Sequence, residues 1–247
     1  MSCKELYLAL DVDGYESSVN VDYKLESIVD FDKNIIGYEC LVNARRLTLE
    51  EIKVIFYKEF SLPFLFMNLM KRIKYDLKNN QRDGLHCLLK NRKLFINIER
   101  SCVCNRVIIN EIIHFKKYLM TLNIELVLEV TEREASVCWA CSEIYSGLSE
   151  LSKNQVLLAV DDYDIYNGDF RSSELSIYNY IKIEVPKNEN QYQQLDSFIR
   201  NSQSTLNIVI ERIESQAELT RVTQKGIATS LRGFQGFVFG KPLPINI

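Results

Sequence analysis

Short apolar runs that end abruptly in charged or amide side chains recur along this chain, and they constrain its fold more than any other feature. The clearest is the sequence VLLAV at residues 156–160, which is followed directly by Asp161 and Asp162. A run this short is typical of a strand buried on both faces, whose carboxyl end opens into a site. Two adjacent carboxylates repel each other unless a cation lies between them or one pKa is strongly raised. From this stretch alone, a solvated Asp-Asp turn after an ordinary strand is an equal alternative.

Such runs alternate with helical patterns along the whole chain. Strands are predicted in residues 21–43, on either side of a turn at 32–34, and then at 93–97, 125–132, 156–160, 180–184, 208–211 and 236–240. Helices are predicted at about 48–60, 63–90 with interruptions, 105–121, 134–152, 189–203 and 215–225. This alternation favours parallel strands with helices outside them.

About eight strands in 247 residues predict a TIM-like (β/α)8 barrel with its site at the carboxyl ends of the strands. The opening pair is the exception, because two strands joined by a tight turn must be antiparallel. The fold class is therefore α/β, a barrel with one antiparallel strand near the N-terminus. A doubly wound open sheet is the alternative, and it is weakened by the lack of a glycine-rich phosphate-binding sequence.

Composition excludes several classes of protein. Apolar residues make up 47% of the chain, charged residues make up 26%, and the formal net charge is -3, as in an ordinary globular protein. We expect no direct DNA binding, because the charge gives no nucleic-acid footprint. We also expect no membrane span, since no apolar run approaches about 18 residues. The start of the chain, MSCKE, is too polar for a secretory signal, so the expected location is the cytoplasm.

The side chains that usually bind zinc are sparse or poorly spaced. Seven scattered cysteines fit reduced, buried thiols better than a disulfide framework. Cys138 and Cys141 form a CxxC within helix-like sequence, and without a second pair they are expected to pack rather than to bind metal. His86 and His114 are the only histidines, each among helix-like residues. A metal site here must therefore use oxygen ligands.

Seven motifs stand in order where the predicted strands end. They are Glu39-Cys40-Leu41, Asn97, Glu129-Val130-Thr131-Glu132, Asp161-Asp162, Lys182-Ile183-Glu184, Glu211 with Glu214, and Gln235-Gly236 ending in Lys241-Pro242-Leu243-Pro244. In this order and spacing they resemble the EAL domain, the family that hydrolyses the bacterial second messenger cyclic di-GMP. The resemblance covers roughly residues 20–247, which implies a single stand-alone EAL domain over 1–247 with residues 1–20 as a lead-in.

The resemblance also implies roles for particular residues. The family's first cation would be held by Glu39, Asn97, Glu129 and Asp161, and a second by Asp161 with Asp162. These oxygen donors suit Mg2+ or Mn2+. Lys182 would orient the attacking water or stabilise negative charge, while Glu211 and Gln235 would hold Lys182, metal-bound water or substrate. The residues implied at the substrate are Leu41, Asn43, Arg45 and Gln235, and Glu132 matches the family residue that tethers the loop following strand 6.

The loop after Asp161 departs from the family pattern. The family sequence DFGTGYSS is replaced by DYDIYNGD at residues 162–169, so that Asp164 and Tyr166 stand in place of glycines. Glycine permits backbone angles that are closed to larger residues, so a conformation unlike the family's is expected, with Asp162 displaced. Asp164 is expected to add a third carboxylate beside Asp161 and Asp162, and their mutual repulsion to disorder the loop when cations are absent.

Other departures predict weaker nucleotide binding. Asn43 stands where the family has an arginine that would grip a phosphate, and Arg45 or Arg46 is the candidate to compensate. Glu26-Ser27 replaces a Gln-Pro pair, which brings a carboxylate toward an anionic ligand. Lys182-Ile183-Glu184 replaces the usual KxD, and about four extra residues lie between Gly226 and Gln235.

Three hypotheses remain open from the sequence. The first is a two-metal phosphodiesterase that converts cyclic di-GMP to linear pGpG with weakened activity. The second is a degenerate, inactive EAL protein that regulates gene expression or motility by contacting a protein partner. The third is a receptor that binds cyclic di-GMP without turnover. A second copy of the chain is a further candidate partner, because the family's loop is linked to dimerisation.

Overall fold

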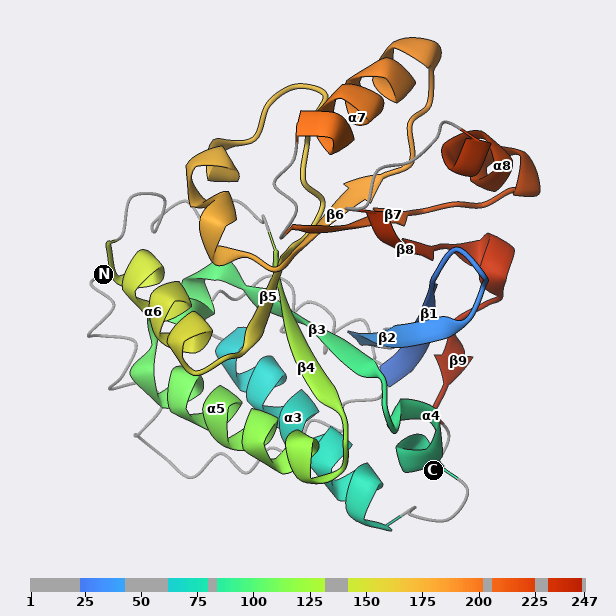
Figure 1. Cartoon of the computed structure of the whole chain (residues 1–247). Helices are drawn as coiled ribbons and strands as arrows, with labels where there is room; N and C mark the ends of the chain where they lie inside the picture. The colour runs from blue at the N-terminus through green and yellow to red at the C-terminus, as the bar shows by residue number, and fades with distance from the viewer. Residues whose placement is uncertain are drawn as a thin grey trace, which may run out of the picture.

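The strands of this protein close into a barrel. The computed structural model describes residues 23–42, 62–79, 84–131, 142–201, 206–224 and 231–245. Its strands are β1 (Tyr23–Val29), β2 (Ile35–Val42), β3 (Lys93–Glu99), β4 (Glu125–Thr131), β5 (Leu157–Val160), β6 (Tyr180–Glu184), β7 (Asn207–Glu211), β8 (Leu231–Gln235) and β9 (Leu243–Pro244). Strands β2 to β8 run parallel in chain order, and β1 closes the ring antiparallel to both β8 and β2. The predicted TIM-like barrel with one antiparallel strand is confirmed (Figure 1).

Helices surround the outside of the barrel (Figure 1). They are α3 (Leu62–Asn79), α4 (Leu85–Leu89), α5 (Arg106–Thr121), α6 (Ser142–Lys153), α7 (Glu189–Asn201) and α8 (Gln216–Gln224), with short 3-10 helices η2 (Arg100–Cys104), η3 (Phe170–Ile177) and η4 (Phe237–Phe239). The helix predicted at 48–60 lies outside the described residues, as does the beginning of the one predicted at 134–152. The interrupted pattern at 63–90 corresponds to α3 and α4.

The strand predicted at 236–240 is wrong. The last barrel strand, β8, ends at Gln235, and η4 follows it. Gly236 causes the change of direction, because its φ of 146° takes the chain out of the strand. The end of the chain returns to the barrel through β9, where Leu243 pairs with Leu25 of β1.

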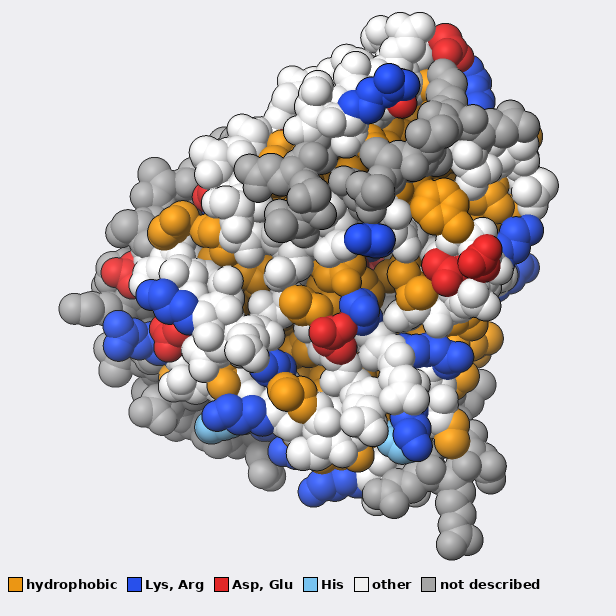
Figure 2. Space-filling view, in the orientation of Figure 1, with side chains coloured by type: hydrophobic (Ala, Val, Ile, Leu, Met, Phe, Trp, Pro, Cys, Tyr) orange, Lys and Arg blue, Asp and Glu red, His pale blue; other side chains and the backbone are white. Residues whose placement is uncertain are grey.

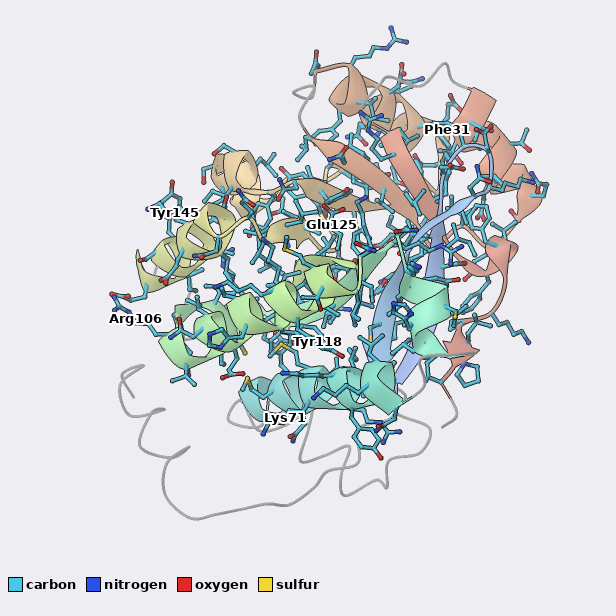
Figure 3. All side chains as sticks on the ribbon, turned by 60° about the horizontal axis from the view of Figure 1, so that its bottom comes forward. Phe31, Lys71, Arg106, Tyr118, Glu125 and Tyr145 are labelled. Atoms are coloured by element: carbon cyan, nitrogen blue, oxygen red, sulfur yellow. The ribbon has the colours of Figure 1, made fainter. Side chains whose placement is uncertain are left out.

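Local sequence explains how the outer layer forms. The side chain of Asn105 caps α5 by accepting hydrogen bonds from the backbone N–H groups of Val107 and Ile108, at 2.9 and 3.4 Å. Figure 3 shows α5 and α3 side by side below the barrel. Lys74 of α3 places its Nζ 5.2 Å from the ring centroid of Tyr118 on α5, which joins the two helices at their surface.

The alternation of side chains along each strand builds the site. In β4, Leu126, Leu128 and Val130 pack with the apolar layer under the helices. Val127 faces the opposite way and joins an apolar cluster of Ile28, Phe95, Ala159, Tyr180 and Val209. Two residues on, the same face of β4 carries Glu129. The equivalent positions on the other strands, or directly after β5, are also polar: Glu26, Glu39, Asn97, Asp161, Lys182, Glu211 and Gln235.

Charges of both signs are mixed among the described residues on one outer face of the molecule. On the face drawn in Figure 2, basic and acidic side chains are interspersed with apolar ones. Within the described residues, no helix is both long enough and apolar enough to cross a bilayer. The concentration of acidic groups at the mouth of the barrel is therefore the feature that calls for a chemical explanation.

Candidate functional site

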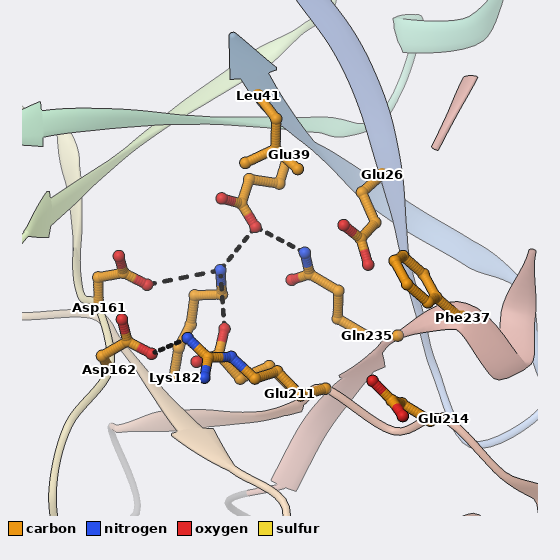
Figure 4. Close-up of a pocket in the computed structure, with 12 residues that line it drawn as sticks. Glu26, Glu39, Leu41, Asp161, Asp162, Lys182, Glu211, Glu214, Gln235 and Phe237 are labelled. Atoms are coloured by element: carbon orange, nitrogen blue, oxygen red, sulfur yellow. Dashed lines mark hydrogen bonds and ion pairs between the residues drawn. The ribbon is translucent and has the colours of Figure 1, made fainter. Parts of the chain in front are cut away.

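Lys182 lies at the centre of four carboxylates at the mouth of the barrel, three of which, Glu39, Asp161 and Glu211, are drawn in Figure 4. Its Nζ is 2.7 Å from Glu39, 3.1 Å from Glu129, 3.1 Å from Glu211 and 3.6 Å from Asp161. The lysine side chain is only 1% exposed. A single buried ammonium thus balances part of the negative charge that β2, β4, β7 and the end of β5 bring to one point.

Glu39 is the most firmly oriented of the four carboxylates. Its Oε1 accepts a hydrogen bond from Asn97 Nδ2 at 2.8 Å, and its Oε2 accepts from Lys182 Nζ at 2.7 Å and Gln235 Nε2 at 2.6 Å. Burial opposes ionisation, but the charge of Lys182 and these hydrogen bonds outweigh it and lower the pKa of Glu39 to about 2. Glu39 is therefore a preformed anion.

The other three carboxylates are destabilised as anions. Burial, with the nearby charge of Glu39, raises the pKa of Glu129 well above its ordinary value. Burial also raises the pKa of Asp161, and it raises the pKa of Glu211 to about 8, in both cases more than Lys182 lowers it. Burial lowers the pKa of Lys182, but the surrounding carboxylates raise it further, so the ammonium stays charged. If all four carboxylates were ionised, their charge would exceed what one lysine can neutralise, and a divalent cation would supply the balance.

Several buried oxygens here have no hydrogen-bond donor within the described part of the chain. They include Oδ1 of Asn97 and both carboxylate oxygens of Glu129. Glu129 Oε1 does lie 3.1 Å from Lys182 Nζ, but this is an ion pair without hydrogen-bonding geometry. Buried acceptors are seldom left unsatisfied. Carboxylate and amide oxygens are the ligands preferred by Mg2+ and Mn2+, so this set of donors fits a hard divalent cation.

A second group of carboxylates lies at the outer edge of this cluster. Ligand oxygens of Asp161, Asp162 and Glu211 all lie within 4.8 Å of one another. The Asp162 side chain is 50% exposed, and its Oδ1 accepts a hydrogen bond from Arg212 Nη2 at 3.2 Å. Arg212 also reaches Glu184, with Nη1 3.5 Å from its Oε1. Asp161 is thus shared between the buried cluster and an exposed one.

A cavity of about 350 Å3 opens above these residues. The residues that line it are Glu26, Glu39, Leu41, Asp161, Asp162, Lys182, Glu211, Arg212, Glu214, Gln235, Gly236 and Phe237. Six of them are carboxylates and two are cationic, so the described walls are strongly acidic. Asn97 and Glu129 are not among the residues that line the cavity. The volume is within the range of small-molecule sites.

The loop after β5 is held by its own hydrogen bonds. Asp164 accepts from the backbone N–H groups of Tyr166 and Asn167, at 2.8 and 3.0 Å, and from Asn167 Nδ2 at 2.8 Å. Tyr166 donates its hydroxyl to the Glu184 carbonyl at 3.0 Å. The expectation that Asp164 lies beside Asp161 and Asp162 is therefore wrong, because the group of neighbouring carboxylates is Asp161, Asp162 and Glu211. The Asp164 carboxylate stabilises a turn instead, a common use of aspartate. Disorder of the loop without cations stays a prediction.

Gly236 allows the end of β8 to lie close to the loop after β7. A Cβ atom at this position would lie 2.2 Å from the Ile213 carbonyl oxygen, which no side chain could tolerate. The close approach allows Ile213 N–H to donate to the Gln235 carbonyl at 3.0 Å. The end of β8 is thereby fastened to the loop after β7, which brings Gln235 and Glu211 to the same cavity.

The structure brings together most of the residues that the sequence singled out. Glu39, Asn97, Glu129, Asp161, Lys182, Glu211 and Gln235 form one cluster, with Leu41 and Asp162 on the cavity wall. Asn43, Arg45, Arg46, Glu132, Cys138 and Cys141 lie outside the described residues. The sequence reasoning missed Arg171, Arg212 and Phe237. Arg212 and Phe237 stand beside the motif residues Glu211 and Gly236, a signal that could have indicated them.

The sequence matches a known protein family over most of its length. The family model described as EAL domain matches residues 18–242. The chain belongs to the EAL domain family. A search of curated proteins finds no match.

Solved structures share the fold of this EAL domain. One is BlrP1 of Klebsiella pneumoniae in complex with calcium and cyclic di-GMP, with a TM-score of 0.70 and 18% identity. Another is the PaMucR phosphodiesterase in complex with cyclic di-GMP, with a TM-score of 0.68 and 17% identity over 91% of this chain and 97% of that one. BlrP1 is longer: the match covers 95% of this chain but only 59% of BlrP1. This chain therefore spans about three fifths of BlrP1.

Proposed function

We propose that this EAL domain hydrolyses cyclic di-GMP to linear pGpG with the help of Mg2+ or Mn2+. The observation that carries the proposal is the polar layer at the barrel mouth, to which each strand of the barrel, or the residue directly after it in the case of β5, contributes one side chain. Within that layer, buried oxygens of Asn97 and Glu129 have no hydrogen-bond donor among the described residues. Both BlrP1 and PaMucR, which share the fold, are described as complexes with cyclic di-GMP.

The arrangement suggests how the chain's residues divide the work. Glu39, Asn97, Glu129 and Asp161 would hold an inner cation, and Asp161 with Asp162 an outer one. Such a pair, when bound, activates a water and neutralises the phosphodiester. The ammonium of Lys182 points into the middle of the cluster and forms ion pairs with the surrounding carboxylates. It would also orient the attacking water. Gln235 and Asn97 fix the Glu39 carboxylate by hydrogen bonds, which preorganises it before any ligand arrives.

Loss of Glu39 is the direct test of this proposal. Glu39→Ala removes the carboxylate that accepts three hydrogen bonds, so conversion of cyclic di-GMP to pGpG should disappear. Glu111→Ala removes an exposed carboxylate on α5 and should leave the rate unchanged. Product is measured by chromatography after incubation with Mn2+ or Mg2+. Absence of pGpG with the unaltered chain at micromolar concentration after hours would contradict the enzymatic proposal.

The acidic cavity favours a second candidate, a regulatory EAL protein with little or no turnover. Six carboxylates face two cationic side chains among the described wall residues, and one of the six, Glu26, lies on the side toward Phe237 (Figure 4). A ligand with two phosphates would meet repulsion there unless cations bind first. In this case the chain would act on gene expression or motility through a protein partner.

Calorimetry separates the two candidates. For the enzyme, cyclic di-GMP should bind only when Mn2+ or a non-catalytic cation such as Ca2+ is present, because the cation offsets the repulsion. A receptor without turnover would give binding heat and no pGpG. No binding heat under any cation condition would leave the protein-contact candidate.

A further inference from the structure

Asp162 has a backbone conformation that its neighbours must enforce. Its φ is 46°, in the left-handed region that residues with side chains rarely adopt. Two flanking bonds hold the turn to the barrel. Asp161 N–H donates to the Val130 carbonyl at 3.3 Å, and Tyr163 N–H donates to the Lys182 carbonyl at 2.9 Å. These bonds place the turn, but neither reaches the carbonyls of Asp161 and Asp162.

The guanidinium of Arg171 reaches both of those carbonyls. Its Nη1 donates to the Asp161 carbonyl at 2.9 Å, and its Nη2 lies 3.4 Å from the Asp162 carbonyl. The side chain has no exposed area. A planar guanidinium with its donors in fixed directions can hold two consecutive carbonyls, which a lysine ammonium cannot do with the same geometry.

Asp169 holds Arg171 in turn. Its Oδ1 accepts from Arg171 Nε at 2.9 Å and its Oδ2 accepts from Nη2 at 2.6 Å, a two-point contact between side chains that are both fully buried. The same carboxylate accepts from the backbone N–H groups of Arg171 and Asp164, at 2.8 and 3.2 Å. Asp169 therefore closes the loop and orients the arginine at once.

We propose that Arg171 and Asp169 are positioning residues, which set the direction of the Asp161 and Asp162 side chains from behind. Their hydrogen bonds hold a turn that, in the family sequence, contains glycines with freer backbone angles. The inference rests on the proposed function only in treating Asp161 and Asp162 as cation ligands. Neither Arg171 nor Asp169 lines the cavity, so each acts through the backbone of the turn.

Asp169→Asn tests the pair, and Asp76→Asn is its matched control. Asp76 is also a buried carboxylate held by an arginine, since Arg72 Nε lies 3.0 Å from both its oxygens, but it is on α3 outside the barrel. Both variants should lower the unfolding temperature. Only Asp169→Asn should also weaken Mn2+ binding measured by calorimetry, by about ten- to a hundredfold as is usual when a partner of a metal ligand is lost.

A second variant covers the case in which Asp169→Asn does not fold. Arg171→Lys keeps the charge beside Asp169 but cannot serve both carbonyls, so it should weaken Mn2+ binding with a smaller loss of stability. Mn2+ affinity equal to that of the unaltered chain, in a folded Asp169 or Arg171 variant, would overturn the inference.

Hydrogen exchange of the cation-free protein gives a readout that does not depend on the proposed function. Amides at residues 161–164 should exchange faster in both positioning variants and at the normal rate in Asp76→Asn. If the unaltered chain binds no Mn2+, the proposed function fails, and the exchange rates alone then decide. Unchanged exchange at these amides in the positioning variants would contradict the positioning role.

Discussion

The buried and exposed halves of the site are built by different means. In the buried half, strand positions place Glu39, Glu129 and Lys182, and each of these residues is at most 5% exposed. In the exposed half, Asp162 stands on a turn and is paired with Arg212, which is 59% exposed. The buried half is held in place by the strands before any ligand binds. The exposed half depends on contacts with other side chains, such as that of Arg212 with Asp162. The two halves should therefore respond differently to substitution.

Lys182→Met should give the largest effect in the buried half. The variant leaves four carboxylates around an apolar side chain, and breaking a buried charge network typically costs about 3 to 5 kcal/mol of the free energy of unfolding. Urea unfolding in EDTA measures this loss. Because the carboxylates then lack a counter-charge, Mn2+ should stabilise the variant more than it stabilises the unaltered chain. Lys117→Met, on the exposed side of α5, should change stability by less than about 0.5 kcal/mol. Equal losses in the two variants would contradict the comparison.

Gly236→Ala should give a smaller loss at the junction of the two halves. A side chain at a backbone angle such as φ 146° costs on the order of 1 to 3 kcal/mol, and here the new Cβ would also strike the Ile213 backbone. Gly240→Ala separates the two causes, since Gly240 has a φ of 123° but nothing within 4 Å of an added Cβ. Urea unfolding should show a greater loss for Gly236→Ala. Equal losses would mean that the contact with Ile213 is easily relieved.

The buried half could be predicted from the sequence because strands have a period of two. Once the apolar runs were assigned to parallel strands, polar residues at the ends of the runs were expected together at the barrel mouth. The resemblance to the EAL family then singled out Glu39, Asn97, Glu129 and Lys182 among them. The position of the last strand was wrong because Gly236 and Phe237 continue an apolar pattern while the backbone turns away.

The exposed half could not be predicted because its geometry depends on contacts between side chains and backbone. From the sequence, Asp164 and Asp169 were simply two more carboxylates in an acidic loop. In the structure, Asp164 accepts hydrogen bonds within a turn, and Asp169 is buried against Arg171. Substituting the family's glycine-rich sequence over residues 162–169 would delete Asp169 and leave Arg171 buried without its partner. The swap should therefore destabilise the loop unless Arg171 is also replaced.

Arg212→Ala should give the smallest effect and tests the exposed half most directly. The guanidinium neutralises Asp162 from the solvent side, so an outer cation must compete with it for the same carboxylate. Exposed ion pairs are worth about 0 to 1 kcal/mol, which limits the expected gain in Mn2+ affinity to about fivefold.

The control for this variant must change the net charge equally. Arg200→Ala removes a 70% exposed arginine that pairs with Asp196 on α7, away from the cavity. Calorimetry at low salt should show tighter Mn2+ binding for Arg212→Ala than for Arg200→Ala, and the difference should shrink as salt screens the exposed pair. Weaker Mn2+ binding in Arg212→Ala would show instead that Arg212 orients Asp162 for the cation. In that case the carboxylates of both halves would be oriented by a neighbouring cationic side chain.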